Sequence, residues 1–279
     1  MVRVAAIVIA LTAAGALAVA IIAPAHATRP ASRSTVPVKK RSRHVSRVPK
    51  AHVPKAHRST MDASTAAHLT TPTDAAETPA YRYAQLSQAA CEAELASRAI
   101  SFVRETAAGV LAPVRLTAPL HGVVFRTDQS DRVRPTSPYE IADCRLVLAL
   151  DDLAEILNRH DIVEVRHYSM YRPPKALPED QIGKRHPAAL AIDAGRFIDT
   201  SGTVLDVDRD FHGAIDAKTC GEGAAPDPPT PAALALRAIL CEIVDRRLFN
   251  VVLTPNYNRP HKNHFHLEVT AGVRWFLVH

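Results

Sequence analysis

The segment 84–279 of this sequence predicts an α+β domain. Patterns typical of helices and of strands follow one another irregularly along it, unlike the regular alternation of a βαβ sheet. Its roughly 195 residues are enough to bury one core. The segments 1–27 and 28–83 differ from it in composition and have separate interpretations.

Three stretches carry apolar residues at helical spacing. The first begins at Ser87, and its apolar positions are Cys91, Leu95, Ile100 and Val103. The second covers 146–157. The third is the clearest, because Thr230 is an N-cap residue ahead of Pro231 and apolar residues recur from there to about Leu248.

Short runs between these stretches predict strands. Each run is apolar or alternates apolar with polar residues, and Pro, Gly, Asn or Asp bounds it. The runs are 114–125, 162–168, 189–198, 251–253 and 264–269.

The first 27 residues read as a secretory signal. Arg3 precedes the apolar stretch 4–22, and Ala25-His26-Ala27 offers a small-x-small cleavage site. An uncleaved membrane anchor formed by residues 4–22 is the alternative, because this stretch approaches the roughly 20 residues that span a bilayer. The signal predicts a secreted or cell-envelope protein, periplasmic or extracellular.

Residues 28–83 predict a disordered linker that is basic and rich in Pro, Ala, Ser and Thr. Ten Lys and Arg and no acidic residue lie in 28–60, which exceeds the formal net charge of +6 of the whole chain. This charge predicts attraction to peptidoglycan or another anionic envelope polymer. No nucleic acid is expected, because no aromatic residue precedes Tyr81 to stack on bases. A solvated linker without a specific partner is the alternative.

All four cysteines lie in the domain. In an oxidising compartment an even number predicts two disulfides. Three connectivities are possible, and pairing Cys91 with Cys144 and Cys220 with Cys241 is favoured because it closes the shorter loops. Zinc thiolate ligation is less favoured, since no pair has C-x-x-C spacing.

Histidines cluster near the C-terminal end. On a strand, His264, His266 and Glu268 project to one face while the apolar residues between them project to the other. One imidazole can then ligate a metal while its neighbour contacts the water that the metal binds, and His261 precedes the strand, from where it can fold over the site. A half-exposed strand with incidental histidines is the alternative.

A second cluster is formed by His186 and Asp193. Asp193 lies within the apolar run 189–198, where an unpaired carboxylate is costly, so a cation or several hydrogen bonds are expected as its partners. Two histidines and one carboxylate form the common three-ligand set of catalytic zinc sites, which leaves a fourth position for water.

The His-x6-Asp pattern at 186–193 and the later His-x-His at 264–266 resemble the zinc peptidases that include lysostaphin, D-Ala-D-Ala carboxypeptidases and Hedgehog-type domains. More closely, the chain from Cys91 onward resembles the bacterial extensin-like C-terminal domain. The similarity lies in Asn-x-x-His-x-x-His-Phe-His at 258–266 and in Ala-x-Asp-x-x-x-Phe at 191–197. The resemblance implies a small central antiparallel sheet flanked by helices, as in Hedgehog and D-Ala-D-Ala peptidases.

The resemblance also implies roles for individual residues. His186, Asp193 and His266 would ligate Zn²⁺, with His264 beside the metal-bound water. His261 completes a His-x2-His-x-His spacing similar to that of penicillin-insensitive murein endopeptidases. His264 and His261 are therefore the expected catalytic residues, together with an upstream arginine.

That arginine is Arg172, which matches the extensin-like pattern and is expected to hold a substrate carboxylate or carbonyl, with an ordinary loop arginine as the alternative. Asn263 stands where other branches have a Glu general base, so His264 or His261 must activate water. Lys184 and Ala189 replace the family's usual small residue and Gly around the first ligand. Lys184 and Arg185 add positive charge beside that ligand, which weakens metal binding or favours an anionic substrate.

Two functions follow. The first is an exported zinc peptidase that hydrolyses amide bonds of peptidoglycan, as a murein endopeptidase or D,D-carboxypeptidase does. The second is a non-catalytic wall-binding or structural module with a remnant metal site, which the missing Glu base favours. A serine hydrolase and a nucleotide-dependent enzyme are disfavoured, because the sequence has no Gly-x-Ser-x-Gly element and no phosphate-binding loop.

Overall fold

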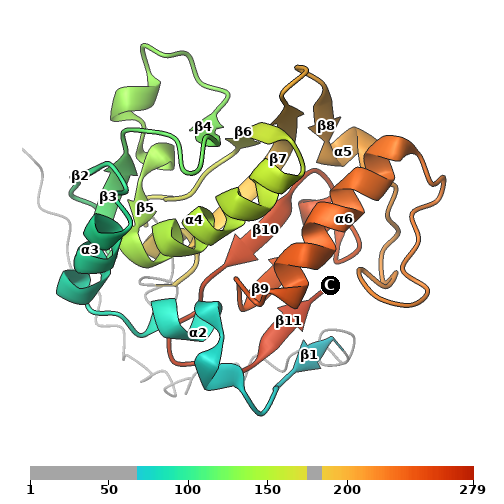
Figure 1. The fold of residues 1–279 in the computed structure, drawn as a ribbon, viewed down its shortest axis with the longest axis horizontal. Coiled ribbons are helices and arrows are strands. Elements are labelled where there is room, and N and C mark those ends of the chain that lie inside the picture. Colours follow the sequence, from blue (N-terminus) through green and yellow to red (C-terminus); the bar gives the residue numbers. More distant parts are fainter. Residues whose placement is uncertain (1–67, 175–183) are drawn as a thin grey trace, which may run out of the picture. The chain divides into compact units, whose positions relative to one another are not determined.

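The computed structural model describes residues 68–174 and 184–279. The expected signal at 1–27, its alternative as an anchor at 4–22 and most of the expected linker at 28–83 lie outside the described residues. The described part is a mixture of helices and sheets, so the predicted α+β class is confirmed (Figure 1). Every helix in this part is too short or too polar to cross a bilayer.

The larger sheet has eight strands among the described residues. Seven form the row β1 (Leu69–Thr70), β11 (Phe276–Val278), β9 (Val251–Leu253), β10 (Phe265–Glu268), β7 (Ala191–Asp199), β6 (Ile162–His167) and β4 (Val124–Thr127), and β8 (Val204–Asp206) pairs with β7. β4 is parallel to β6, and β11 is parallel to β9. The sheet is thus larger than the small antiparallel sheet implied by the resemblance. It is also mixed, because helix α4 (Cys144–Arg159) lies in the crossover between β4 and β6.

A second sheet contains three antiparallel strands within the described ranges: β2 (Phe102–Arg104), β3 (Pro113–Leu116) and β5 (Ala142–Asp143). The run 114–125 therefore divides between two sheets, into β3 and β4. Gly122, with φ +83°, lies in the turn between them. The prediction of one strand here was wrong, because Pro119 and Gly122 interrupt the run where the chain turns.

The three predicted helices are confirmed. Ser87 accepts a hydrogen bond from a backbone amide at the start of α3 (Gln88–Ser97), and Thr230 does the same at the start of α6 (Pro231–Asp245). α4 covers the second predicted stretch. The first helix is shorter than its apolar pattern, because Ala99 turns the chain with φ +56° and Val103 lies in β2.

Shorter helical segments connect these elements. They are α2 (Pro79–Ala84), α5 (Val207–Asp210) and the 3-10 helices η1 (Ala75–Glu77), η2 (Arg134–Thr136), η3 (Pro138–Glu140), η5 (His186–Ala188) and η6 (Arg259–His261).

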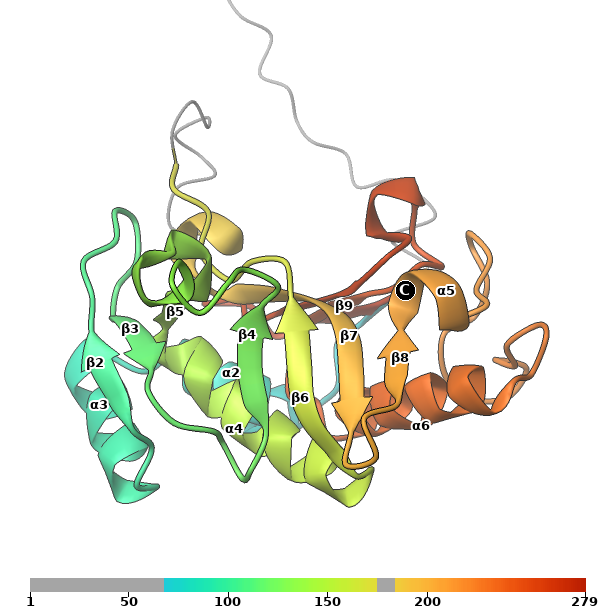
Figure 2. The same cartoon turned by 90° about the horizontal axis from the view of Figure 1, so that it is seen from above.

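Helices α4 and α6 lie against one face of the larger sheet (Figure 2). Their leucines and isoleucines share one buried cluster with Ile192 and Ala194 of β7 and with Phe265 and Leu267 of β10. Successive side chains of a strand point to opposite faces. The residues between these apolar positions therefore face away from the two helices, on the side where the candidate site lies.

The fold begins before the expected domain boundary at residue 84. Leu69 pairs with Leu277 in the register of β1 and β11, and Ala80 of α2 is fully buried. The Tyr83 hydroxyl donates a hydrogen bond of 2.5 Å to the Asp152 carboxylate in α4. The boundary was set too late because Pro79 was counted with the proline-rich linker, whereas it occupies the first turn of a helix.

Both disulfides have the favoured pairing. Cys91 is bonded to Cys144 and joins α3 to α4, and Cys220 is bonded to Cys241 and joins the segment before α6 to that helix. Two disulfides are consistent with an oxidising compartment outside the cytoplasm.

Candidate metal centre

The two strand-borne ligands are brought together by the pairing of β7 with β10, in which Asp193 lies opposite His266. Both side chains project from the face that α4 and α6 leave uncovered. The predicted alternation in β10 is confirmed, since Phe265 and Leu267 are in the core while His266 and Glu268 are on the other face. The sheet register thus fixes the relative position of a carboxylate and an imidazole.

The third predicted ligand, His186, is the first residue of η5. The Arg172 amide donates a hydrogen bond of 3.0 Å to the His186 carbonyl, which ties this turn to the segment after β6. Ala189 follows the turn with φ +53°, a left-handed conformation that favours Gly. The residue at this position is Ala, so a residue with a Cβ has this conformation here.

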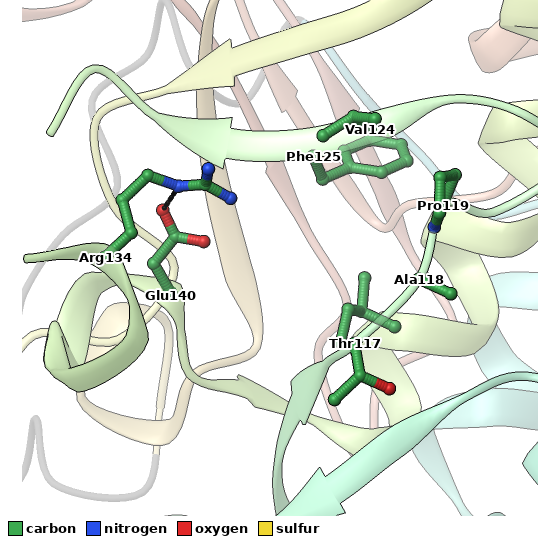
Figure 3. A pocket seen from close by; sticks show the side chains of 8 residues that line it. Thr117, Ala118, Pro119, Val124, Phe125, Arg134 and Glu140 are labelled. Atoms are coloured by element: carbon green, nitrogen blue, oxygen red, sulfur yellow. Dashed lines mark hydrogen bonds and ion pairs between the residues drawn. The ribbon is translucent and has the colours of Figure 1, made fainter. Parts of the chain in front are cut away.

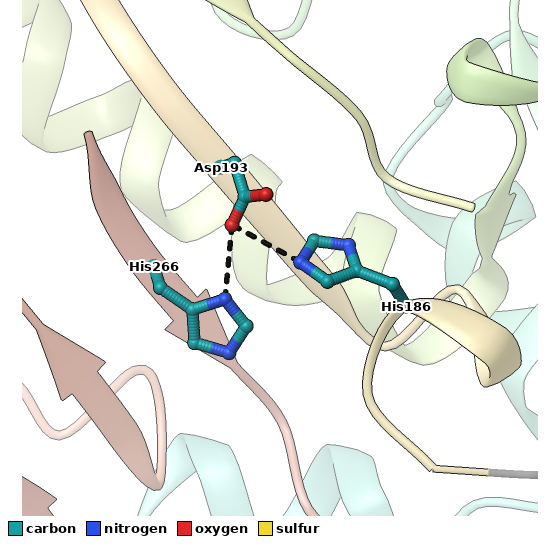
Figure 4. Close-up of side chains that lie close together, drawn as sticks. All are labelled: His186, Asp193 and His266. Atoms are coloured by element: carbon teal, nitrogen blue, oxygen red, sulfur yellow. Dashed lines mark hydrogen bonds and ion pairs between the residues drawn. The ribbon is translucent and has the colours of Figure 1, made fainter. Parts of the chain in front are cut away.

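Ligand atoms of His186, Asp193 and His266 lie within 4.8 Å of one another, and all three residues are buried (Figure 4). Asp193 Oδ1 is 3.0 Å from His186 Nε2 and 2.9 Å from His266 Nδ1. The carboxylate comes from the centre of the sheet and the two rings approach it from β10 and η5. This group could hold a metal ion.

The outer ring nitrogens of both histidines have their own partners. His186 Nδ1 lies 2.9 Å from the Met170 carbonyl oxygen, and His266 Nε2 lies 3.3 Å from Glu268 Oε2. Both partners accept hydrogen bonds, so each ring donates its outer N–H and directs the other nitrogen to Asp193. Metal-ligating histidines in proteins have this arrangement, and the donor set therefore fits a metal.

The two predicted catalytic histidines lie beside the ligands. His264 Nε2 is 3.3 Å from Asp193 Oδ1, and its Nδ1 is 2.9 Å from the Asn263 side-chain oxygen. The centroid of the His261 ring is 5.2 Å from that of His264 and 5.7 Å from that of His266. Three imidazoles therefore contact one buried carboxylate oxygen, and the fourth, that of His261, lies beside two of them.

Arg172 also reaches this site, but through Asp193. Its Nε donates a hydrogen bond of 2.9 Å to Ser169 Oγ, and its Nη2 pairs with Asp193 Oδ2. Half of the Arg172 side chain is exposed, at 51%. The guanidinium thus occupies one oxygen of Asp193 and leaves Oδ1 to the histidines.

The protonation of the cluster is set by burial and by these contacts. Burial raises the pKa of Asp193, but hydrogen bonds from His186, His264 and His266 outweigh it and hold the pKa well below its usual range. Burial lowers the pKa of His186. The pKa of His266 is raised, because its hydrogen bonds to Asp193 and Glu268 outweigh burial.

His261 is neutral at physiological pH. Burial, together with the neighbouring His266 and His264, lowers the pKa of His261 to about 4. Its Nδ1 is 2.6 Å from the Asn258 side-chain oxygen, which accepts the ring proton. A lone pair is therefore left on Nε2, as proton acceptance requires.

Sequence reasoning missed two residues of this site, Tyr168 and the role of Glu268. Tyr168 is 42% exposed, its ring meets that of His264 edge-on at 5.8 Å, and its hydroxyl accepts a 3.3 Å hydrogen bond from the Asn263 amide. A Cβ on Gly195 would lie 3.1 Å from the Tyr168 ring. Gly195, two residues after Asp193, was the available signal for this close approach.

A separate pocket lies near β4 (Figure 3). Arg134 Nε and Glu140 Oε1, 3.1 Å apart, form its polar end, and Val124 and Phe125 are among its apolar lining residues. None of the three candidate metal ligands lines it. The histidine cluster, and not this pocket, is therefore the candidate functional site.

Comparison with protein families, with characterised proteins and with solved structures finds no match to this chain.

Proposed function

We propose that this protein is an exported zinc-dependent peptidase that hydrolyses amide bonds in the peptides of the bacterial cell wall. The observation that carries the proposal is the convergence of His186 Nε2 and His266 Nδ1 on one oxygen of the buried Asp193, with two further histidines beside them. Two nitrogens and one carboxylate oxygen are the ligands of open, catalytic zinc sites.

When bound, the zinc ion would supply Lewis-acid activation of water and of the substrate carbonyl. His264 and His261 would handle the protons, since Asn263 cannot act as a general base. His261, neutral and with its Nδ1 proton held by Asn258, accepts a proton at Nε2, and His264 presents its Nε2 toward Asp193.

Arg172 would orient the substrate from the rim of the site. Its contacts with Ser169 and Asp193 hold the guanidinium in place through Nε and Nη2, and half of the side chain is exposed. A carboxylate or carbonyl oxygen of the substrate is the natural partner for such an arginine.

Export is supported by the signal-like segment 1–27 and by the two disulfides. The basic stretch 28–60 would hold the protein against anionic wall polymer. Retention on purified wall that falls with rising salt and disappears when residues 28–60 are deleted would support this adhesion. Equal retention of the two proteins would make the stretch a plain linker.

A second candidate is a wall-binding module that keeps the metal site without turnover. The specific observation in its favour is Asn263, which stands where related zinc peptidases have a Glu base. This candidate predicts wall binding that a chelator does not change and no cleavage products from sacculi.

The test begins with zinc stoichiometry on the exported chain, with both disulfides formed. We expect about one zinc per chain, lost in His186→Ala and in His266→Ala and kept in the control His121→Ala, whose half-exposed ring lies on another part of the surface. Digestion of purified sacculi then separates the candidates, since only the peptidase releases fragments. A wild-type chain without zinc under metal-replete conditions would refute the zinc peptidase.

A further inference from the structure

Glu268, the last residue of β10, is buried, with 4% of its surface exposed. Its carboxylate has no role in the proposed reaction. It lies two residues after His266 and on the same face of the strand. We propose that Glu268 is a positioning residue that makes His266 bind the metal through Nδ1. This inference rests on the proposed zinc site.

Each oxygen of the Glu268 carboxylate has a partner. Oε2 is 3.3 Å from His266 Nε2, and Oε1 accepts a hydrogen bond of 2.9 Å from the Thr270 hydroxyl. The Arg185 Nε is 3.9 Å from Oε2, but the Arg185 side chain is 67% exposed and solvent weakens that ion pair. The carboxylate is therefore held chiefly by Thr270 and directed at one imidazole.

A neutral imidazole carries a proton on one ring nitrogen and a lone pair on the other. The nitrogen that donates its N–H to a hydrogen-bond acceptor keeps the proton, so the lone pair lies on the other nitrogen. Glu268 lies at His266 Nε2, whereas Nδ1 is 2.9 Å from Asp193 Oδ1 and hydrogen-bonds to it. With the Nε2 proton held by Glu268, neutral His266 would offer the lone pair of Nδ1 to a metal. His186 is the reverse case, because its Nδ1 proton goes to the Met170 carbonyl and its Nε2 faces Asp193. The two histidines thus present opposite nitrogens, and Glu268 selects the nitrogen of His266.

Glu268 also adds charge next to the ligands. A divalent cation in a buried site is costly unless negative groups surround it. Asp193 shares its charge with Arg172, whereas the partners of the Glu268 carboxylate within residues 68–174 and 184–279 are His266, the Thr270 hydroxyl and the exposed guanidinium of Arg185. Partners of this kind, beyond the ligands themselves, change metal affinity by roughly 10–100-fold when removed.

The test is the zinc affinity of the full chain, measured by competition with a chromophoric chelator. Glu268→Gln keeps the shape of the side chain and removes its charge, and we expect about 10–100-fold weaker binding. Glu242→Gln is the matched control, because Glu242 Oε2 also faces a histidine, at 3.0 Å from His160 Nε2. This pair lies on α6 and at the end of α4, on the sheet face opposite the candidate ligands. We expect the zinc affinity of Glu242→Gln to equal that of the wild type.

Equal zinc affinities of Glu268→Gln and the wild type would overturn the role of Glu268 alone. A wild-type chain that takes up no zinc would overturn the proposed function and this inference with it. If Glu268→Gln does not fold, ring-nitrogen NMR of the zinc-bound wild type decides. We expect metal on His266 Nδ1 and the proton on Nε2, and the opposite assignment would refute the proposal.

Discussion

His264 and His266 are two residues apart, the first just before β10 and the second within it, yet they have different partners. His266 lies between Asp193 and Glu268, whereas His264 is held by Asn263 and approaches Asp193 from the side. At the scale of the residue, His266 is thus a candidate metal ligand, whereas His264 is a neighbour of the candidate ligands.

We predict that His266→Ala loses zinc and hydrolysis together, whereas His264→Ala keeps about one zinc and loses turnover. Loss of a group that handles protons costs about 10²–10⁴-fold in kcat. Elemental analysis and a sacculus digestion assay on the same preparations measure the two effects. Full activity in His264→Ala would assign proton transfer to His261 alone.

His167 of β6 is fully buried, and within the described part of the chain neither ring nitrogen has a hydrogen-bond partner. Burial lowers the pKa of His167 from 6.5 to about 4. The unfolded chain therefore binds a proton that the folded protein does not between these values, and stability falls as pH falls from 6.5 through about 4.

For His167→Leu we predict a weaker loss of stability in acid, because the variant has no proton to take up on unfolding. The shift corresponds to about 3 kcal/mol of extra acid destabilisation in the wild type. Urea unfolding at pH 7 and pH 4.5 compares the two proteins, and other titrating groups such as Asp193 are common to both. Parallel pH profiles of the two proteins would show that His167 is solvated.

At the scale of the element, sequence patterns predicted what depends on local spacing. β9 is wholly apolar, β10 alternates apolar and polar residues, and α6 begins after the capping residue Thr230. Each of these elements was therefore predicted near its observed bounds. The strands β1, β2, β5, β8 and β11 were not predicted. Each has two or three residues, too few to show a pattern, and each is held by pairing with a neighbouring strand.

In the candidate site, too, local motifs were predictable from the sequence and contacts made by tertiary packing were not. The residues expected to ligate metal were implied by the resemblance to known zinc peptidases. In the structure the β7–β10 register brings Asp193 and His266 together, and η5 brings His186 to them. The pairing of Arg172 with Asp193 could not be predicted, since 20 residues separate them and only the packing of the segment after β6 against β7 brings them together. The left-handed backbone of Ala189 was also hidden, because Ala rarely has this conformation.

The two disulfides close loops of different length. Cys91 and Cys144 are 53 residues apart, and Cys220 and Cys241 are 21 apart. Removing the longer link through Cys91→Ala with Cys144→Ala is predicted to lower the free energy of unfolding by about 4 kcal/mol, and removing the shorter by about 3 kcal/mol, by loop-closure entropy. Denaturant unfolding of the two double variants measures this, and a larger loss from the shorter link would show that packing dominates.

At the scale of the whole molecule, the site is a junction between separate parts of the fold. β7 pairs with β6 on one edge and with β10 and β8 on the other, and η5 and the segment carrying Arg172 close over it. A ligand that binds only the assembled site therefore stabilises the entire domain.

We predict that free zinc at 100 times its dissociation constant raises the free energy of unfolding by about 2.7 kcal/mol, and at 1,000 times by about 4.1 kcal/mol. Calorimetric melting in zinc buffers should show this dependence for the wild type and none for His266→Ala. Identical melting temperatures in zinc and in chelator would contradict a zinc site of useful affinity.

Two ligands of the candidate metal stand on interior strands, and the third stands on the three-residue helix η5. Backbone amides of β7 can exchange with deuterated water only when the sheet itself comes apart, whereas those of η5 can exchange through opening of a single turn. A bound ion would join the turn to the strands. Uptake of metal would then slow deuterium incorporation most at His186 and its neighbours, and least along β7, although Asp193 of β7 is the central ligand.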